Sequence, residues 1–265
     1  MKIIAHRGAN REALENTWIA FEKAIDAGAE MIELDAQMTA DGEVVIVHDD
    51  HLQRVVDTTY DMCVSRLTAD EVRNLKLKDG SHIPFLKDVI QEILPRIDIN
   101  IEIKGSSLVL AEKVGDMVSQ SKYHDKVLLS SFEWIPLRLL EKKFSFIKRA
   151  FLCGGEPAWY VFPSGAPHIF LDEIHTNIIH PCVHIVTENL MDQAKARGWT
   201  VNVWIPMDGE EEGREDLWVS MLSLEVDGLC TNYPRQLKRW LEEVDANAEI
   251  FARIEKDLAH KVHRT

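Results

Sequence analysis

The stretch Met31–Asp50, MIELDAQMTADGEVVIVHDD, contains two acidic residues, Glu33 and Asp35, within an apolar segment. Side chains alternate along a strand, so these two carboxylates lie on one face. Carboxylates side by side repel each other unless a cation or a proton lies between them. An Asp-Gly turn and the apolar run Val44–Val47 follow, and His48 comes directly after that run. The stretch therefore predicts a strand-turn-strand with a cation site beside a titratable group, which indicates metal-assisted chemistry.

On both sides of this stretch, apolar strands alternate with helical segments about eight times, which favours a parallel sheet with helices outside it. Eight such units in 265 residues have the size of a closed (β/α)8 TIM barrel. An open doubly wound sheet is the alternative, but a GxGxxG turn does not follow the first strand. The predicted strands are Lys2–Ala5, Met31–Asp35 with its extension Val44–Val47, Asp98–Lys104, Val127–Phe132, Ile147–Leu152, a weak strand within His175–His180, Thr200–Ile205 and Val226–Thr231.

Helix signals separate these strands. Thr68 and Glu71 form a capping-box pattern at the start of Leu67–Leu75, and Gly28 and Gly198 follow two helical segments as C-terminal caps. We expect a single domain over 1–265, with a polar helical C-terminal tail at about 242–265. The predicted helices are WIAFEKAIDAG, which ends in Gly28, Leu67–Leu75, Pro84–Leu94, Leu108–Ser121, Ile135–Lys143, a short one around Ala158–Phe162, Thr187–Arg197, Arg214–Leu224 and Arg235–Leu258.

Composition narrows the class of partner. The chain has 30 basic and 44 acidic residues, a net charge of −14, which repels nucleic acid and anionic membranes. Its four cysteines are far apart and form no CxxC, which is typical of reduced structural thiols. The N-terminus lacks an apolar secretory segment, and no apolar run approaches the ~20 residues of a spanning helix. We therefore expect a cytoplasmic protein without nucleic-acid partners or stable membrane association.

The active site of a TIM barrel lies at the C-terminal ends of its strands. Three carboxylates at these ends suit a hard divalent cation, Mg²⁺ or Ca²⁺. Arginine and lysine suit a phosphate, and two histidines suit general acid and base roles. The site therefore predicts metal-assisted cleavage of a phosphate ester. The residues at the strand ends are His6, Arg7, Glu33, Asp35, His48, Glu102, Lys104, Phe132, Trp204 and Asn232.

The order of these motifs resembles the glycerophosphodiester phosphodiesterase family, in its short cytoplasmic bacterial form, over residues 2–241. Each tripeptide alone is a weak signal, but the ordered set is very specific. The motifs are His6-Arg7-Gly8, Glu15-Asn16-Thr17, Glu33-Leu34-Asp35, Thr39-x-Asp41-Gly42, His48-Asp49-x-x-Leu52-x-Arg54, Ile83-Pro84-x-Leu86, Glu102-x-Lys104, Ser131-Phe132, Val203-Trp204 and Asp227-Gly228-x-x-Thr231-Asn232-Tyr233-Pro234.

The resemblance implies a TIM barrel that hydrolyses glycerophosphodiesters, such as glycerophosphocholine or glycerophosphoethanolamine, to sn-glycerol 3-phosphate and an alcohol. The substrate is a small molecule, the cofactor is one divalent cation, Mg²⁺ or Ca²⁺, and the chain is expected as a monomer or homodimer. The implied roles are metal ligation by Glu33, Asp35 and Glu102, acid/base catalysis by His6 and His48, phosphate binding by Arg7 and Lys104, and contact with the glycerol or alcohol by Phe132 and Trp204.

Several points stay open at the level of sequence. Asn16 is expected to cap the first helix and to touch substrate, and Asp49 is expected to orient His48. The segment Val56–Ser65 lacks the glycine turn that the family often has, and no large domain follows His48, so the leaving-group preference is undetermined. A lysophospholipase D and a binding protein without turnover are the alternative functions. Which histidine is acid, which is base, and whether a cyclic phosphate forms are also undetermined.

Overall fold

Eight parallel strands close into a barrel in the computed structural model, which describes residues 1–154, 171–207, 209 and 211–247. The strand order is β1-β9-β8-β7-β6-β5-β4-β2, and pairing of β1 with β2 closes the ring. This closure confirms the TIM barrel and excludes the open doubly wound sheet, which would leave two edges. The barrel strands are β1 (Lys2–His6), β2 (Met31–Met38), β4 (Asp98–Ile103), β5 (Val127–Ser131), β6 (Lys148–Cys153), β7 (Ile178–Pro181), β8 (Thr200–Trp204) and β9 (Gly228–Thr231).

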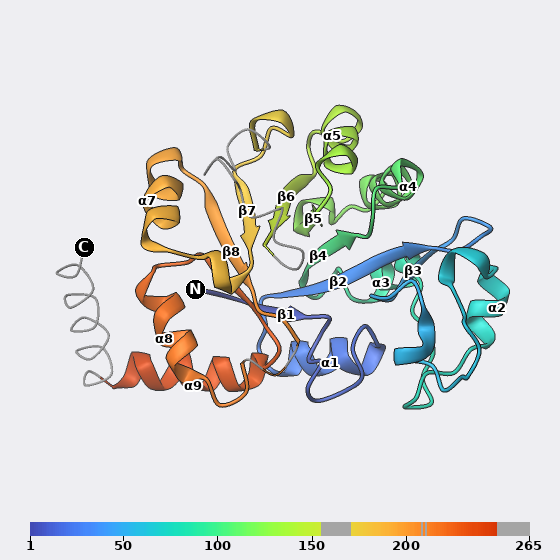
Figure 1. The fold of residues 1–265 in the computed structure, drawn as a ribbon, viewed down its shortest axis with the longest axis horizontal. Helices are drawn as coiled ribbons and strands as arrows, with labels where there is room; N and C mark the ends of the chain where they lie inside the picture. Colours follow the sequence, from blue (N-terminus) through green and yellow to red (C-terminus); the bar gives the residue numbers. More distant parts are fainter. Residues whose placement is uncertain (155–170, 208, 210, 248–265) are drawn as a thin grey trace.

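Helices surround the barrel, as Figure 1 shows for α1, α4, α5 and α7 to α9. Thr68 and Glu71 form the predicted capping box at α2, and Gly198 ends α7 in the left-handed conformation. The predicted helix around Ala158–Phe162 and the part of the polar tail after residue 247 lie outside the described residues. The helices are α1 (Trp18–Asp26), α2 (Ala69–Asn74), α3 (Leu86–Glu92), α4 (Leu108–Ser119), α5 (Trp134–Lys143), α7 (Glu188–Arg197), α8 (Glu215–Ser223) and α9 (Pro234–Ala246), with 3-10 turns at Leu52–Arg54, Val64–Arg66, His124–Lys126 and Val183–Ile185. Among the described residues, no helix is long and apolar enough to cross a membrane.

Apolar side chains fill two layers of the barrel. The larger layer lies between the strands and the surrounding helices and includes Phe21, Ile101 and Leu237. A smaller cluster closes the barrel interior: Ile4, Met31, Leu128, Ala150 and Cys230. This packing closes the barrel interior below its mouth. All four cysteines are buried free thiols, as the sequence predicts.

A hairpin and a long loop leave the barrel after β2. The strand β3 (Val44–Ile46) pairs antiparallel with β2 and lies outside the ring of parallel strands. The following residues, up to Phe85, form a second apolar core around Val45, Leu52 and Val64, distinct from the two barrel clusters. Figure 1 shows β3 and α2 on the side of the molecule away from α7 and α8. We refer to residues 44–85 as the excursion; it carries His48.

The register of the parallel strands decides which side chains face each other at the mouth. His6 is opposite Glu33, which in turn is opposite Asn100. Two residues further along the same strands, Asp35 is opposite Glu102. Residues in register on neighbouring strands point to the same face of the sheet, so these five side chains share the barrel interior. The strand pairing alone therefore brings one histidine and three carboxylates together.

Gly8, directly after β1, allows the first loop to turn against α1. Its φ is +80°, and a Cβ atom there would lie 2.7 Å from the backbone carbon of Ala20. Both features require glycine, since a side chain would be strained and would also collide with backbone that cannot move alone. Gly80 has a similar φ of +84° but has no atom within 4 Å of its Cβ position. Comparing a substitution at Gly8 with one at Gly80 therefore separates the cost of backbone strain from the cost of a steric clash.

We predict that Gly8→Ala lowers the free energy of unfolding by about 1–3 kcal/mol more than Gly80→Ala, which should cost about 1–2 kcal/mol from backbone strain alone. Urea denaturation of both variants measures the difference. Equal losses in the two variants would show that the contact between Gly8 and Ala20 does not limit stability.

Candidate active site

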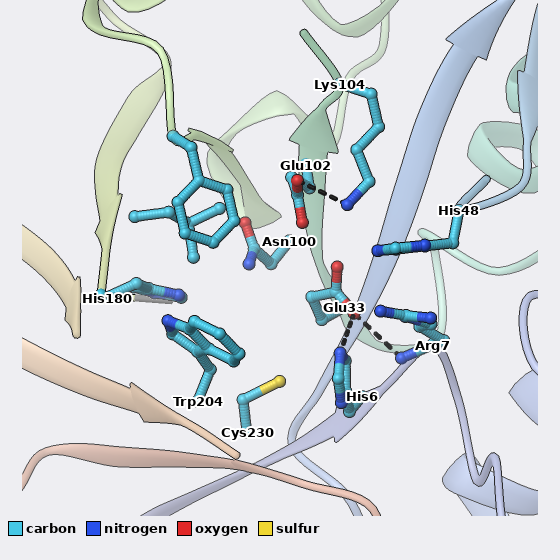
Figure 2. A pocket seen from close by; sticks show the side chains of 13 residues that line it. His6, Arg7, Glu33, His48, Asn100, Glu102, Lys104, His180, Trp204 and Cys230 are labelled. Atoms are coloured by element: carbon cyan, nitrogen blue, oxygen red, sulfur yellow. Dashed lines mark hydrogen bonds and ion pairs between the residues drawn. The ribbon is translucent and has the colours of Figure 1, made fainter. Parts of the chain in front are cut away.

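A cavity of about 280 Å³ opens at the C-terminal mouth of the barrel. In Figure 2, Arg7, His48 and Lys104 lie on one side of Glu33 and Glu102, and His180, Trp204 and Cys230 lie on the other. One side of the cavity is thus strongly charged, while the other is mostly apolar. Its lining residues are His6, Arg7, Glu33, His48, Asn100, Glu102, Lys104, Phe132, Leu152, Gly154, His180, Trp204 and Cys230.

Three buried carboxylates from β2 and β4 meet beneath the cavity. One oxygen of each of Glu33, Asp35 and Glu102 lies within 4.8 Å of the others. Burial and the neighbouring acids raise the pKa of Glu33 well above its ordinary value, and burial likewise raises the pKa of Glu102. Burial also opposes ionisation of Asp35, but Lys104 and Arg7 outweigh it and hold its pKa well below its usual range. Metal-free, the trio therefore resists carrying three negative charges at once.

This donor set fits a hard divalent cation. Carboxylate oxygens are the ligands that Mg²⁺ and Ca²⁺ prefer, and a cation would relieve the repulsion within the trio. A second group of this kind among the described residues, Asp50 with His51 and Cys63, differs because two of its members are exposed. Of these two groups among the described residues, only the carboxylate trio of Glu33, Asp35 and Glu102 consists entirely of buried side chains, and its members Glu33 and Glu102 line the cavity.

Lys104 and Arg7 bring positive charge to the trio. The Lys104 Nζ atom lies 2.6 Å from Glu102 Oε1 and 2.9 Å from Asp35 Oδ1. Burial opposes the charge of Lys104, but Asp35 and Glu102 outweigh it and raise the Lys104 pKa. The Arg7 Nε atom is 3.2 Å from Asp35 Oδ2, and the Arg7 backbone N–H donates to Glu33 Oε2 at 2.9 Å. Both side chains also line the cavity, where an anionic ligand would meet them.

His6 is held at the end of β1 by a neutral amide. Its Nδ1 is 3.0 Å from Asn232 Oδ1, and its Nε2 lies 4.0 Å from Glu33 Oε2. Burial, together with the positive charge of Arg7, lowers the pKa of His6 to about 3. The imidazole is therefore neutral at pH 7, with one ring nitrogen anchored and the other beside the carboxylates.

His48 is held by a carboxylate instead. Its Nδ1 is 2.7 Å from Asp49 Oδ1, the contact that the sequence predicts for Asp49. Arg54 donates from Nε to the other Asp49 oxygen at 2.5 Å. Burial and the charges of Lys104 and Arg7 lower the pKa of His48. Because Asp49 occupies Nδ1, the Nε2 atom of His48 is the nitrogen left for a ligand.

The motif Glu15-Asn16-Thr17 supports the site from behind. Glu15 accepts from Arg7 Nη1 at 2.9 Å and from both terminal nitrogens of Arg54, at 2.6 and 2.7 Å. Asn16 Nδ2 donates to Asp35 Oδ2 at 2.7 Å, and Asn16 is not among the residues lining the cavity. The expectation that Asn16 caps the helix is wrong, since Thr17 accepts from the Ala20 N–H and is the N-cap of α1.

The apolar side of the cavity rests on Phe132 and Trp204, as the sequence predicts. Their rings meet edge to face, with centroids 5.8 Å apart and planes at 90°. The Trp204 indole N–H donates to the Cys153 carbonyl at 3.3 Å, which fixes the ring. Both residues line the cavity, so this side offers an apolar surface to a bound ligand.

Two buried polar residues of the cavity were not predicted as site residues. Asn100 makes no hydrogen bond through either side-chain polar atom. His180 Nε2 lies 2.9 Å from Asn202 Nδ2, and its Nδ1 has no partner. Buried polar groups are nearly always paired, so these atoms are available to ligand hydroxyls or water. A signal for Asn100 exists in the sequence, because it lies two positions before Glu102 and hence on the same face of β4.

These features define the chain as a TIM-barrel enzyme with a buried acidic and cationic site at its mouth. The sequence profile of the "Glycerophosphoryl diester phosphodiesterase family" matches residues 6–236, and the chain belongs to this family of phosphodiesterases.

The similarity to individual relatives extends over most of this chain and of theirs. A glycerophosphodiester phosphodiesterase of Bacillus altitudinis is 32% identical over 92% of this chain and 99% of that protein. A lysophospholipase D of Rattus norvegicus is 29% identical over 92% of this chain and 87% of that protein. The crystal structure of a glycerophosphodiester phosphodiesterase from Thermotoga maritima, 27% identical, matches 90% of this chain and 97% of that one with a TM-score of 0.71. An Oleispira antarctica phosphodiesterase in complex with the product sn-glycerol-3-phosphate, 22% identical, shares the fold with a TM-score of 0.77 over 91% and 97% of the two chains.

The neutral state of His180 generates a prediction about acid stability. Burial lowers the pKa of His180 from 6.5 to about 3. Below pH 6.5 the unfolded chain therefore binds a proton that the folded chain refuses, so stability falls as the pH drops from 6.5 towards 3. We predict that His180→Gln removes up to about 1.4 kcal/mol per pH unit from this slope. Urea denaturation of both proteins at several pH values measures it, and parallel pH profiles would contradict a neutral buried His180.

Proposed function

We propose that this protein hydrolyses glycerophosphodiesters, such as glycerophosphocholine or glycerophosphoethanolamine, to sn-glycerol 3-phosphate and an alcohol in a metal-dependent reaction. The observation that carries the proposal is the carboxylate trio beneath a cavity that His6, His48, Arg7 and Lys104 also line. Family membership and the product complex of the Oleispira antarctica phosphodiesterase support the same substrate class. We further propose that the protein acts on this small molecule in the cytoplasm, as a monomer or homodimer.

Glu33, Asp35 and Glu102 would hold one divalent cation, Mg²⁺ or Ca²⁺. Such a cation, when bound, supplies Lewis-acid stabilisation of the charge on the phosphate oxygens. The charges of the site support this assignment. The trio carries up to three negative charges against Lys104 and Arg7, and Arg7 also pairs with Glu15. A divalent cation and an anionic phosphodiester together would bring the site close to neutrality.

The two histidines would exchange protons with the substrate through their Nε2 atoms. Both use Nδ1 for a fixed contact within the protein, to Asn232 for His6 and to Asp49 for His48. One imidazole would take the proton of the attacking hydroxyl, and the other would give a proton to the leaving alkoxide. The attacking hydroxyl belongs either to water or to the glycerol itself, and in the second case the histidines exchange roles between two steps.

Arg7 and Lys104 would bind the phosphate while keeping the carboxylates in place. A guanidinium and an ammonium group stabilise charge that develops on the non-bridging oxygens. Phe132 and Trp204 would contact the carbon atoms of the glycerol or of the alcohol. Asn16 is proposed to act through Asp35, since its amide contacts that carboxylate at 2.7 Å.

Two other functions are tested by the same assay. A lysophospholipase D would have to accommodate the long acyl chain of its substrate at the mouth of the cavity, and the rat relative bears that name. A binding protein would hold the phosphodiester without turnover. Release of the alcohol, choline or ethanolamine, is measured with glycerophosphocholine, glycerophosphoethanolamine and lysophosphatidylcholine as parallel substrates. Turnover of glycerophosphocholine and glycerophosphoethanolamine supports our proposal. Turnover of lysophosphatidylcholine alone supports a lysophospholipase D, and tight binding without release supports a binding protein.

We predict that His6→Ala and His48→Ala each lower kcat for glycerophosphocholine by about 10²–10⁴-fold, because each removes a proton-transfer group. His82→Ala is the matched control, since His82 is an exposed histidine that bonds to the Leu75 carbonyl and does not line the cavity. The measurement is release of sn-glycerol 3-phosphate at saturating substrate. Wild-type turnover by either cavity variant would refute the assignment of that histidine.

We also predict that chelation abolishes turnover and that adding Mg²⁺ or Ca²⁺ restores it. Calorimetric titration of the chelated protein should give one cation per chain, and Glu102→Gln should weaken this binding at least about 10-fold. Glu43→Gln removes an acid outside the site and is the control. Full activity in excess chelator, or unchanged cation affinity of the Glu102→Gln variant, would exclude the trio as the metal site.

A further inference from the structure

A buried carboxylate outside the cavity lies behind His6. Glu211, in the loop after β8, is only 1% exposed. Four donors surround it. Trp218 Nε1 donates to Oε1 at 2.9 Å and the Thr231 hydroxyl donates to the same oxygen, while Oε2 accepts from the Asn232 backbone N–H at 2.7 Å and from Asn232 Nδ2 at 3.1 Å. Burial raises the pKa of Glu211, but all four contacts place its carboxyl group as the acceptor, the role of an ionised carboxylate.

Glu211 and two carbonyls together fix the orientation of the Asn232 amide. Asn232 Nδ2 donates to Glu211 Oε2 and to the carbonyls of Pro206 and Ile205, at 3.0 and 3.4 Å. All three partners are acceptors, so the NH₂ group must face them and the oxygen must face the opposite way. On that opposite side, Asn232 Oδ1 accepts from Asn10 Nδ2 at 2.8 Å. The amide cannot flip without placing acceptors against acceptors.

The fixed amide also decides where His6 carries its proton. Asn232 Oδ1 lies 3.0 Å from His6 Nδ1 and can only accept, so Nδ1 must be the protonated nitrogen. The competing tautomer would carry its proton on Nε2, which lies 4.0 Å from the Glu33 carboxylate and would be attracted to it. In that tautomer Nε2 has no lone pair to accept a proton from a hydroxyl.

We propose that Asn232 is a positioning residue for His6, and that Glu211 holds its amide so that His6 keeps its proton on Nδ1 and presents the bare Nε2 to the cavity. The catalytic consequence of this tautomer rests on the proposed function, whereas the tautomer itself does not. His48 has no such requirement, because both oxygens of its partner Asp49 are acceptors. An amide has an acceptor at one end only, so His6 needs a third group to orient its partner.

The direct test is nitrogen NMR of the metal-free protein with ¹⁵N-labelled histidine, which distinguishes the two tautomers of each ring. We expect His6 to be protonated on Nδ1 in the wild type and to shift towards protonation on Nε2 in Asn232→Ala. His48 is the internal control and should not change in this variant. A wild-type His6 protonated on Nε2 would overturn the proposal without any variant, as would an identical tautomer in Asn232→Ala.

Kinetics provide a second readout. Asn232→Ala should lower kcat about 10–100-fold and leave KM within about threefold, because the ring stays present but presents the wrong nitrogen. Asn177→Ala is the matched control, since Asn177 is exposed and donates to the Gly198 carbonyl. Glu211→Ala should also lower kcat, but not further in the Asn232→Ala background, because its effect passes through Asn232. Additive losses in the double variant would overturn the role of Glu211. If the tautomers change as expected in a protein without phosphodiesterase activity, the proposed function fails and this inference stands.

Discussion

Mutual repulsion among Glu33, Asp35 and Glu102 is the constraint on which this end of the barrel depends. Strand register brings the three acids together in one buried place, and residues of the loops after β1 and β4 offset their repulsion. Lys104 and the loop after β1 bring positive charge, and Asn16 donates to the most strongly ionised member. The arrangement is costly to bury, and contacts with Lys104, Arg7 and Asn16 offset part of that cost.

Much of the fold and the centre of the site followed from local patterns. Alternation of side chains along β2 and β4 places Glu33, Asp35 and Glu102 on one face of each strand. Together with the predicted barrel, this was enough to predict that the three carboxylates lie close to one another. Strand and helix positions agree with the structure within a few residues because apolar periodicity and caps such as Thr68 are local signals. Closure of the ring was an inference from the count of units, which the β1–β2 pairing confirms.

The contacts that support the site residues could not be predicted from the sequence, for a physical reason. Glu211 and Asn232 meet across 21 positions, and Asn232 meets His6 across 226, so no periodicity relates them. Asn16 was assigned to the helix cap because Asn and Thr both suit that position; which of them reaches the helix depends on the turn, and Asn16 has a φ of +55° that directs it to Asp35 instead. The short strand β7, which carries His180, lies in a segment with weak alternation, so its inward face was not identified.

The excursion has its own apolar core, so the two histidines His6 and His48, which line the same cavity, belong to separately packed units. His6 belongs to a barrel strand, whereas His48 belongs to a unit held by Val45, Leu52 and Val64 and tied back through Arg54 and Glu15. Segments with separate cores can open as cooperative units at less free energy than the whole protein. Substitutions in the core of the excursion can therefore move His48 relative to the cavity and change the distance between the two imidazoles. The barrel and its carboxylates would stay unchanged.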